Sequence, residues 1–380
     1  ITPLVGSPAL EAGILPGDLI VAVNGQDVST QELREVSKQL KGPVGTEVDL
    51  AIKRADETVS IRVQRGRIEI ESVIGDYRDK DNRWVYRLRD DPSIAYVRLT
   101  RFGEKTVREL EQVLKSLDND FSGLVLDLRG NGGGLLHAAA EVSDMFINSG
   151  KIVSTRIRGG EVEDRFDATA GTLVDANKPI AILIDTDSAS ASEIVAACLQ
   201  DHKRAKIIGT RSYGKGTVQN ILPLQYGRSA LRLTVARYYR PNGKNIHRGK
   251  DATEDDEWGV QPDEGMEVEL DEETIVDLAK RWREASYPSL ANVKDNTDEV
   301  NEETPTEGTI ETKDNPSPDQ ESDLTEENQN PNPPTSDVIQ DASIKEKEPK
   351  TGLELDPQLR RAVEYLKQQS SGNAKQPTTA

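Results

Sequence analysis

Histidine and cysteine are scarce in this chain of 380 residues, and each shortage excludes a class of chemistry. Three histidines, His137, His202 and His247, make a Ser-His-Asp hydrolase hard to build, and their spacing fits no metal site. The single cysteine, Cys198, excludes an intrachain disulfide and lies in an apolar run, where we expect it to be buried. No apolar run approaches the roughly 18 residues of a membrane span. We therefore expect no metal, no organic cofactor and no membrane-spanning helix within the chain.

Aromatic residues make up 4% of the chain, and residues 291–350 contain none. That segment holds 17 acidic and 5 basic residues, which accounts for most of the net charge of −19. Such a composition cannot bury enough apolar surface to offset its ordering entropy, so the segment is predicted to be a disordered linker. The acidity of the chain is therefore mainly a property of this linker. A net negative charge also argues against a nucleic-acid partner.

A leader sequence is also absent, but the chain begins with Ile1 and opens in what reads as the middle of a domain. We expect a fragment of a longer protein, so the absence carries little weight. Either a secretion signal or a membrane anchor upstream of residue 1 is compatible with this sequence.

Residues 1–66 are predicted to form a small β-rich domain with one helix. Asn24-Gly25 is typical of a tight turn between strands, and Thr30 is expected to cap a helix of about ten residues. Strands are predicted at residues 18–23, 48–52 and 59–63.

Residues 67–290 are predicted to form a larger domain, in which apolar strands alternate with helices. This pattern is typical of a mostly parallel sheet covered by helices on both faces, so the fold class is mixed α/β. Strands are expected at residues 94–99, 123–128, 180–184, 206–209 and 231–236, and helices at residues 104–117, 135–147 and 190–200. Within residues 351–380, an amphipathic helix at 356–369, begun by Asp356-Pro357, is expected to dock on this domain.

A run of small residues that ends at Glu193 carries three serines, Ser188, Ser190 and Ser192. Ser190 and Glu193 have the spacing of a capping box, so a purely structural helix cap is one interpretation. A serine at a helix N-terminus also lies among free backbone amides, which suit a nucleophile and the oxyanion that it creates.

Lys215 lies between two glycines, 25 positions after Ser190. An exposed lysine in a flexible loop is the plain interpretation. A lysine that desolvation keeps neutral can, however, serve as the base that a nucleophilic serine needs. Gln219, four positions further on, can accept a hydrogen bond from the amine and orient it.

Residues 127–134, Asp-Leu-Arg-Gly-Asn-Gly-Gly-Gly, form a glycine-rich loop between a predicted strand and a predicted helix. The loop lacks the Lys-Ser/Thr pair of a phosphate loop and fits the dinucleotide fingerprint poorly. Its backbone amides can instead supply half of an oxyanion hole, and a tight turn that needs glycine is the structural alternative.

These motifs resemble known families when they are taken together. Residues 6–20, Gly-Ser-Pro-Ala-Leu-Glu-Ala-Gly-Ile-Leu-Pro-Gly-Asp-Leu-Ile, resemble the PDZ domains of bacterial proteases. The order of the motifs at residues 127–134, 188–193, 214–219 and 358–366 resembles the C-terminal processing peptidases, which are serine proteases with a PDZ domain and a Ser-Lys dyad. The resemblance covers roughly residues 1–290 and the last helix.

The resemblance implies a serine endopeptidase that cleaves proteins near their C-termini. Matched by motif, Ser190 is the nucleophile and Lys215 is its general base. Gln219 is implied to orient the lysine, and Glu193 has a supporting role.

The implied oxyanion hole consists of the backbone amides of Ala191 and Gly133. The PDZ domain is implied to bind protein or peptide substrates with apolar C-terminal tails by strand addition, and to gate access to the active site. No groove residues are assigned, because the first strand and the carboxylate-binding loop of such domains fall at or before residue 1. An extracytoplasmic, periplasmic location, a part in signal transduction and self-association into oligomers are further implications.

Three positions depart from the family pattern: Gly130 stands where Asn is usual, Gly132 where Pro or Ser is usual, and Asp185 where Asn is frequent. None of them removes a catalytic group.

Two other functions stay open. The first is a catalytically silent PDZ-type adaptor on a protease scaffold, and the retained serine, lysine and glutamine argue against it. The second is an enzyme similar to acyl-CoA hydratases, and the PDZ segment argues against it.

Overall fold

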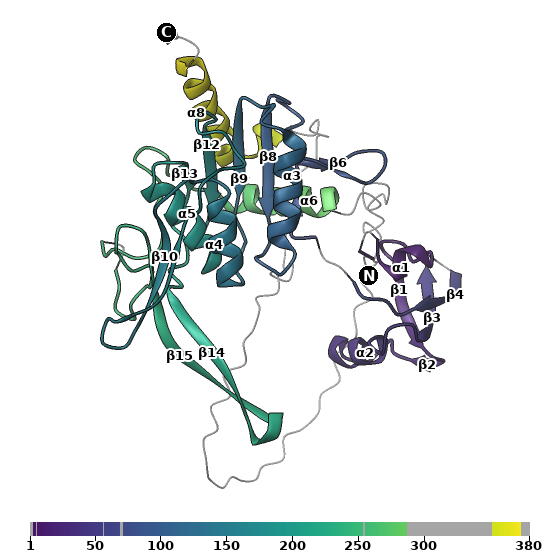
Figure 1. Ribbon diagram of the computed structural model, residues 1–380. Coiled ribbons are helices and arrows are strands. Elements are labelled where there is room, and N and C mark those ends of the chain that lie inside the picture. Colours follow the sequence, from purple (N-terminus) through teal and green to yellow (C-terminus); the bar gives the residue numbers. More distant parts are fainter. Residues whose placement is uncertain are drawn as a thin grey trace, which may run out of the picture. The chain divides into compact units, whose positions relative to one another are not determined.

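The computed structural model describes residues 3–286, apart from residues 5, 56, 69, 70 and 254, and residues 352–373 (Figure 1). The predicted linker at residues 291–350 lies outside the described residues, so its disorder stays a prediction. None of the helices in the described part of the chain has the length and apolar character needed to span a bilayer.

The N-terminal region contains a four-stranded antiparallel sheet in the order β2-β1-β3-β4. Its elements are α1 (Pro8–Glu11), β1 (Leu19–Val23), β2 (Gln26–Asp27), α2 (Leu33–Leu40), β3 (Glu47–Arg54) and β4 (Glu57–Gln64). Asn24 and Gly25 join β1 to β2 with φ values of 49° and 79°, as the predicted tight turn requires. Alternate residues of β3 enter a separate core of this region, formed around Ile14, Val23, Val48, Leu50 and Ile52.

Helix α2 has Glu32 at its N-cap position, so the cap predicted at Thr30 was wrong. The preceding residues form a local turn instead. The Asp27 carboxylate accepts a hydrogen bond from Ser29 N–H at 2.8 Å, and Gln31 N–H donates to Val28 O at 3.0 Å. Because an aspartate that bonds nearby backbone competes with helix formation, this turn delays the start of the helix.

The core region is built on a five-stranded sheet in the order β13-β12-β9-β8-β5. Its strands are β5 (Val73–Ile74), β8 (Ile94–Leu99), β9 (Gly123–Asp127), β12 (Ile180–Ile184) and β13 (Lys206–Gly209). The four longer strands run parallel to one another and β5 is antiparallel to β8. The predicted mixed α/β class with a mostly parallel sheet is confirmed.

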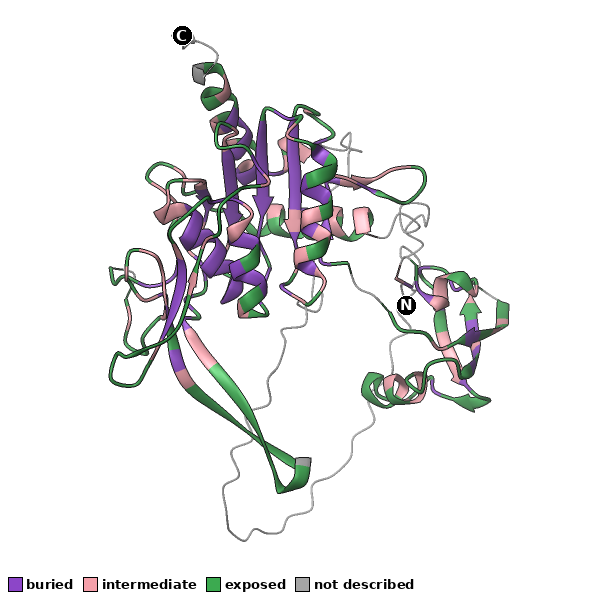
Figure 2. Ribbon diagram, viewed as in Figure 1, coloured by how far each residue is buried: buried purple, intermediate pink, exposed green. Residues whose placement is uncertain are grey.

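Helices cover both faces of this sheet, and its strands are buried along their length (Figure 2). Leu124 and Leu126 of β9 join one hydrophobic core, whereas Val125 between them joins a second core on the opposite face. Helices α3 (Thr106–Leu117), α4 (Leu136–Asp144) and α5 (Ala191–Asp201) pack in the first core, and α8 (Pro357–Asn373) packs in the second. Burial on both faces explains the uninterrupted apolar strands.

Cys198 lies on α5 and is fully buried, as predicted. Burial raises the pKa of its thiol to about 12. The reactive thiolate is therefore scarce at neutral pH.

A second, antiparallel sheet of the core has the order β11-β10-β15-β14. Its strands are β10 (Lys151–Ile157), β11 (Val162–Asp167), β14 (Thr217–Leu224) and β15 (Ser229–Tyr239). The strand predicted at residues 231–236 lies within β15, so it belongs to this sheet and not to the parallel one, and the other three strands were not predicted. Most residues of β11 and β14 are exposed, so these two strands lack the apolar pattern that marks the parallel sheet (Figure 2). The remaining elements are β6 (Tyr77–Arg78), β7 (Trp84–Val85), η1 (Gln225–Gly227), α6 (Glu272–Ser286) and α7 (Gly352–Leu355).

Three loops follow the carboxyl ends of adjacent parallel strands. Strand β9 leads to the glycine-rich loop at residues 128–135, β12 leads to the serine turn at residues 185–190, and β13 leads to the lysine loop at residues 210–216. Because parallel strands end at the same edge of a sheet, this edge collects all three predicted catalytic motifs.

Candidate active site

Ser190 lies at the turn between β12 and α5 in an unusual backbone conformation. Its φ of 54° and ψ of −110° fall in a region that favours glycine, so the turn is strained. Ser190 is the N-cap residue of α5, and it forms with Glu193 the capping box that their spacing predicts. A serine on a strained strand-to-helix turn at a helix N-terminus is a geometry that suits a nucleophile.

The two neighbouring serines are engaged in structural hydrogen bonds. Ser188 Oγ donates to Leu128 O at 2.9 Å, and Ser192 Oγ donates to Asn131 O at 2.8 Å. Both residues are completely buried, whereas Ser190 is 9% exposed. Of the three serines, Ser190 is therefore the one that is partly exposed.

The carboxylate of Glu193 joins the serine turn to the lysine loop. Its Oε2 accepts hydrogen bonds from Ser190 N–H and Lys215 N–H, both at 2.8 Å. Its Oε1 accepts bonds from Gly214 N–H and Ser212 Oγ, both at 2.6 Å. Glu193 is fully buried, which raises its pKa, and these hydrogen bonds offset only part of that effect. One buried side chain thus holds the backbones of Ser190 and Lys215 side by side.

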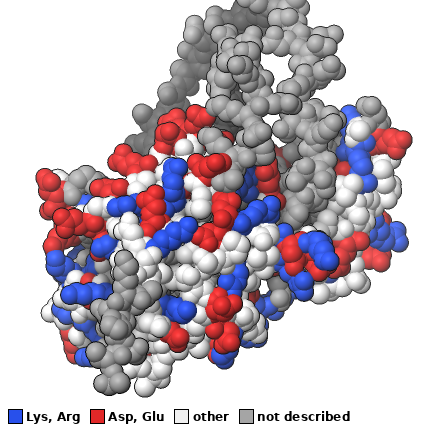
Figure 3. Space-filling model, turned by 90° about the horizontal axis from the view of Figure 1, so that it is seen from above, with Lys and Arg blue, Asp and Glu red and all other residues white. Residues whose placement is uncertain are grey.

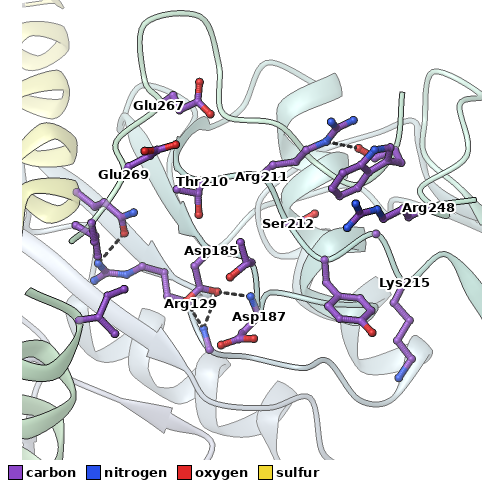
Figure 4. Close-up of a pocket in the computed structure, with 18 of the residues that line it drawn as sticks. Arg129, Asp185, Asp187, Thr210, Arg211, Ser212, Lys215, Arg248, Glu267 and Glu269 are labelled. Carbon is purple, nitrogen blue, oxygen red and sulfur yellow. Dashed lines mark hydrogen bonds between the residues drawn. The ribbon is translucent and has the colours of Figure 1, made fainter. Parts of the chain in front are cut away.

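Lys215 and Gln219 make no hydrogen bond to Ser190 within the described part of the chain. The Lys215 side chain is exposed, and in Figure 4 it extends away from Asp185 and Arg129. Gln219 lies on β14 and is also exposed. In this conformation the lysine side chain lies in solvent, apart from the serine.

Gly133 of the glycine-rich loop lies directly against Ser190. Its φ is 98°, and a Cβ at this position would fall 2.6 Å from Ala189 O and 2.8 Å from Ser190 Cβ, so only glycine fits. The Gly133 N–H donates to Asn131 Oδ1 at 2.9 Å. The Ala191 N–H, in the first turn of α5, has no hydrogen-bond partner among the described residues. Of the two predicted oxyanion donors, the Ala191 amide is therefore free and the Gly133 amide is occupied.

Tyr238, on β15, contacts the site but was not predicted. It is buried, its side chain adjoins that of Ser190, and its backbone N–H donates to Gly216 O at 2.9 Å. Burial raises the pKa of Tyr238, and the nearby Ser190 side chain offsets part of that rise. Its distance from Ser190 in the sequence leaves no local signal by which it could have been found.

His247 packs beside the lysine loop and was likewise not predicted as a site residue. A Cβ on Gly216 would fall 2.2 Å from His247 N, so the two backbones approach as closely as a glycine allows. Burial and the charge of Arg237 lower the pKa of His247, which favours the neutral imidazole. Its Nδ1 is buried without a hydrogen-bond partner among the described residues.

A cavity of about 1250 Å³ adjoins the lysine loop (Figure 4). Its wall includes Lys215, Asp185, Arg129 and Trp258 but neither Ser190 nor Gly133. Lysine, arginine and acidic side chains are also interspersed over the face shown in Figure 3. Across the described residues, no group of three or more His, Cys, Asp or Glu side chains is arranged to hold a metal ion.

We expect Glu193→Gln to destabilise the protein by about 2–4 kcal/mol. Glutamine would place an NH₂ group against N–H and O–H donors whose hydrogen bonds the two carboxylate oxygens now accept. Thermal unfolding measures the change. Glu141→Gln, on an exposed position of α4, is the matched control and should leave the midpoint unchanged. Equal unfolding midpoints for the two variants would contradict the bridging role of Glu193.

Comparison with known proteins identifies the same families as the motifs of the sequence. The profile of peptidase family S41 matches residues 93–266, and that of the PDZ domain matches residues 2–54. The carboxy-terminal-processing protease of Bartonella bacilliformis is 45% identical over 253 residues, which cover 65% of this chain and 55% of that protein. The carboxyl-terminal-processing protease of Synechocystis sp. is 34% identical over 271 residues, which cover 70% of this chain and 58% of that protein.

A solved structure of a photosystem II D1 C-terminal processing protease shares 30% identity with this chain, with a TM-score of 0.43, and the match covers 70% of this chain and 67% of that one. The chain spans about half the length of the curated relatives that it matches. The matched profiles and the identity to named relatives show that the chain belongs to peptidase family S41, the family of the carboxy-terminal-processing proteases, and that it carries a PDZ domain ahead of the protease core.

Proposed function

We propose that this chain is the catalytic part of a serine endopeptidase that cleaves proteins near their C-termini. Ser190 is the nucleophile, Lys215 is its general base, and Gln219 orients the lysine. The observation that carries the proposal is the Glu193 carboxylate, whose Oε2 accepts the backbone N–H groups of both Ser190 and Lys215. Because the two backbones are held together, the lysine side chain can reach the serine hydroxyl by rotation about its own bonds.

In the proposed reaction, Ser190 Oγ attacks the substrate carbonyl carbon and its proton passes to Lys215 Nζ. The lysine returns that proton to the leaving amine as the peptide C–N bond breaks, and water then hydrolyses the acyl-enzyme. The free Ala191 N–H at the start of α5 suits the oxyanion, and the Gly133 N–H joins it once its bond to Asn131 is given up.

We propose that the conformation described here is a closed one. The Ser190 side chain adjoins Tyr238, while Lys215 is exposed and makes no hydrogen bond to Ser190 among the described residues, so the dyad is apart. The PDZ domain, proposed to comprise residues 1–66, binds the apolar C-terminal tail of a protein substrate by strand addition and gates access to the core at residues 67–290. An extracytoplasmic location and self-association are parts of the same proposal.

A catalytically silent adaptor is the second candidate, and the separated dyad is the observation that favours it. Such a protein would bind C-terminal tails through its PDZ domain without hydrolysing them. The separation of Ser190 from Lys215 is expected in an adaptor and in a closed protease alike, so cleavage is the property that separates the two.

The test uses the 380-residue chain with an unfolded reporter protein that ends in an apolar tail, and with the same reporter ending in an acidic tail. We expect mass spectrometry to find new C-termini mainly in the apolar-tailed reporter, and a fluorophosphonate adduct on Ser190. Binding of the apolar tail, seen as fluorescence anisotropy, with neither cleavage nor adduct would overturn the proposal in favour of the adaptor.

A further inference from the structure

The guanidinium of Arg129, near the start of the glycine-rich loop, is the centre of a buried charged network. Arg129 is 5% exposed, and its Nη2 donates to Asp127 Oδ2 at 2.7 Å and to Asp356 Oδ2 at 2.8 Å. Its Nη1 donates to Asp356 Oδ1 and to Gln358 Oε1, both at 3.0 Å. Its Nε donates to Asp127 Oδ1 at 3.0 Å. Every nitrogen of the guanidinium is therefore used, and two of its partner residues come from the start of helix α8.

The acidic partners of Arg129 are themselves buried and fixed. Burial alone would raise the pKa of Asp127, but the charges of Arg129 and Arg98 outweigh it and hold that pKa below its ordinary value. Asp356 Oδ1 also accepts Leu359 N–H at 2.9 Å, which caps the first turn of α8. A buried arginine bonded bidentately to a carboxylate has little freedom to move, so Asp127 and the start of α8 together fix the position of Arg129.

A short series of contacts leads from Arg129 to the nucleophile. Gly130 N–H, the next amide along the chain, donates to both carboxylate oxygens of Asp185 at 2.9 Å. Asn131 donates through Nδ2 to Leu99 O at 2.8 Å and accepts the Gly133 N–H through Oδ1 at 2.9 Å. Gly133 then lies against Ser190. The network around Arg129 thus anchors the glycine-rich loop near its start, and the contacts of Gly130, Asn131 and Gly133 continue from there to the nucleophile.

Helix α8 lies outside the part of the chain that the family profile covers, which ends at residue 266. The Arg129–Asp356 pair joins residues 227 positions apart. Gln358 adds a second tie, because its Nε2 donates to Val268 O at 2.8 Å. The start of α8 therefore holds both the glycine-rich loop and Val268, whose N–H donates to Gly209 O at the end of β13.

We propose that Asp356 and Gln358 of the C-terminal helix are positioning residues for the protease reaction, which act through Arg129 on the glycine-rich loop. The inference rests on the proposed function, because it assigns that loop to the oxyanion. When the Asp356 carboxylate is lost, Arg129 loses its charged partner on α8. The loop then loses the fixed anchor from which the Gly133 amide, once released by Asn131, is directed at the oxyanion.

The test compares Asp356→Asn with Lys367→Ala, a matched change on the same helix. Lys367 pairs with Asp91 at 2.7 Å and has no contact with the Arg129 network, so its variant loosens the docking of α8 alone. With the apolar-tailed reporter as substrate, we expect Asp356→Asn to lower kcat by about 10- to 100-fold while KM changes little. Lys367→Ala should retain kcat. Gln358→Leu, which removes no charge, serves as the milder second variant if Asp356→Asn fails to fold.

Amide hydrogen exchange of residues 128–135 gives a readout that does not depend on activity. We expect faster exchange in Asp356→Asn and unchanged exchange in Lys367→Ala. Equal exchange and equal kcat in both variants would overturn the inference. A loss of kcat that parallels the loss of thermal stability in both variants would also overturn it.

Wild type and Ser190→Ala, run alongside, separate the failure of this inference from that of the proposed function. If wild type cleaves and Ser190→Ala does not, the kcat comparison decides the role of α8. If neither cleaves, the proposed function fails and the positioning role falls with it, while the exchange data still decide whether α8 holds the loop.

Discussion

Ser190→Ala is expected to abolish cleavage of an apolar-tailed reporter, with a loss of at least about ten-thousand-fold in kcat. The nucleophile is removed, while the small change of side chain leaves packing intact and costs about 1 kcal/mol as a lost helix cap. The measurement is the rate of reporter cleavage, with thermal unfolding run on the same preparations.

Two matched controls lie in the same turn. Ser188→Ala and Ser192→Ala each remove a buried hydroxyl that bonds to backbone carbonyls, so both should lose some stability and still cleave. If Ser190→Ala kept wild-type activity while one of these variants lost it, the nucleophile would have to be reassigned to that serine.

Lys215→Met, which keeps much of the apolar stem and removes the amine, is expected to lower kcat by at least about a hundredfold. The loss should spare PDZ binding of the tail, because the substitution lies outside residues 2–54, which match the PDZ profile. Lys280→Ala, an exposed lysine on α6, is the control and should leave kcat unchanged.

The same reaction carries a pH signature. Only the neutral amine can accept the serine proton, so kcat of the wild type should fall steadily as the pH is lowered from about 9 to about 5. A flat rate over that interval would remove Lys215 from the role of base, and attention would then turn to His247 beside it.

The parallel sheet and its helices were predictable because their apolar residues are buried on both faces. Strand β9, for example, is entirely buried, so its run of apolar residues marks it without reference to the rest of the chain. Strand β11 carries the exposed sequence Val-Glu-Asp-Arg-Phe-Asp and is held by pairing with β10, which only the tertiary structure shows.

The same contrast applies to the candidate site. Ser190 and Lys215 were singled out from local motifs, whereas the strand order of the sheet, which brings both to one edge, comes from the structure. The contact of Tyr238 with the serine and the pairing of Arg129 with Asp356 join residues far apart in the sequence, so neither has a local signal. The free lysine side chain could not be predicted either, since its rotamer depends on the conformation of the whole loop.

The buried Cys198 makes the movement that the proposed mechanism requires open to direct measurement in solution. Because the chain has no other cysteine and the pKa of this thiol is raised to about 12, thiol-reactive labels leave it unmodified in the folded protein. Two cysteines introduced on the surface, one beside the serine turn and one on the lysine loop, would carry spin labels or a fluorophore pair without prior removal of a native thiol. The distance between such labels, recorded with and without an apolar tail peptide, would show whether the lysine loop itself moves when a substrate binds or whether only the Lys215 side chain rotates.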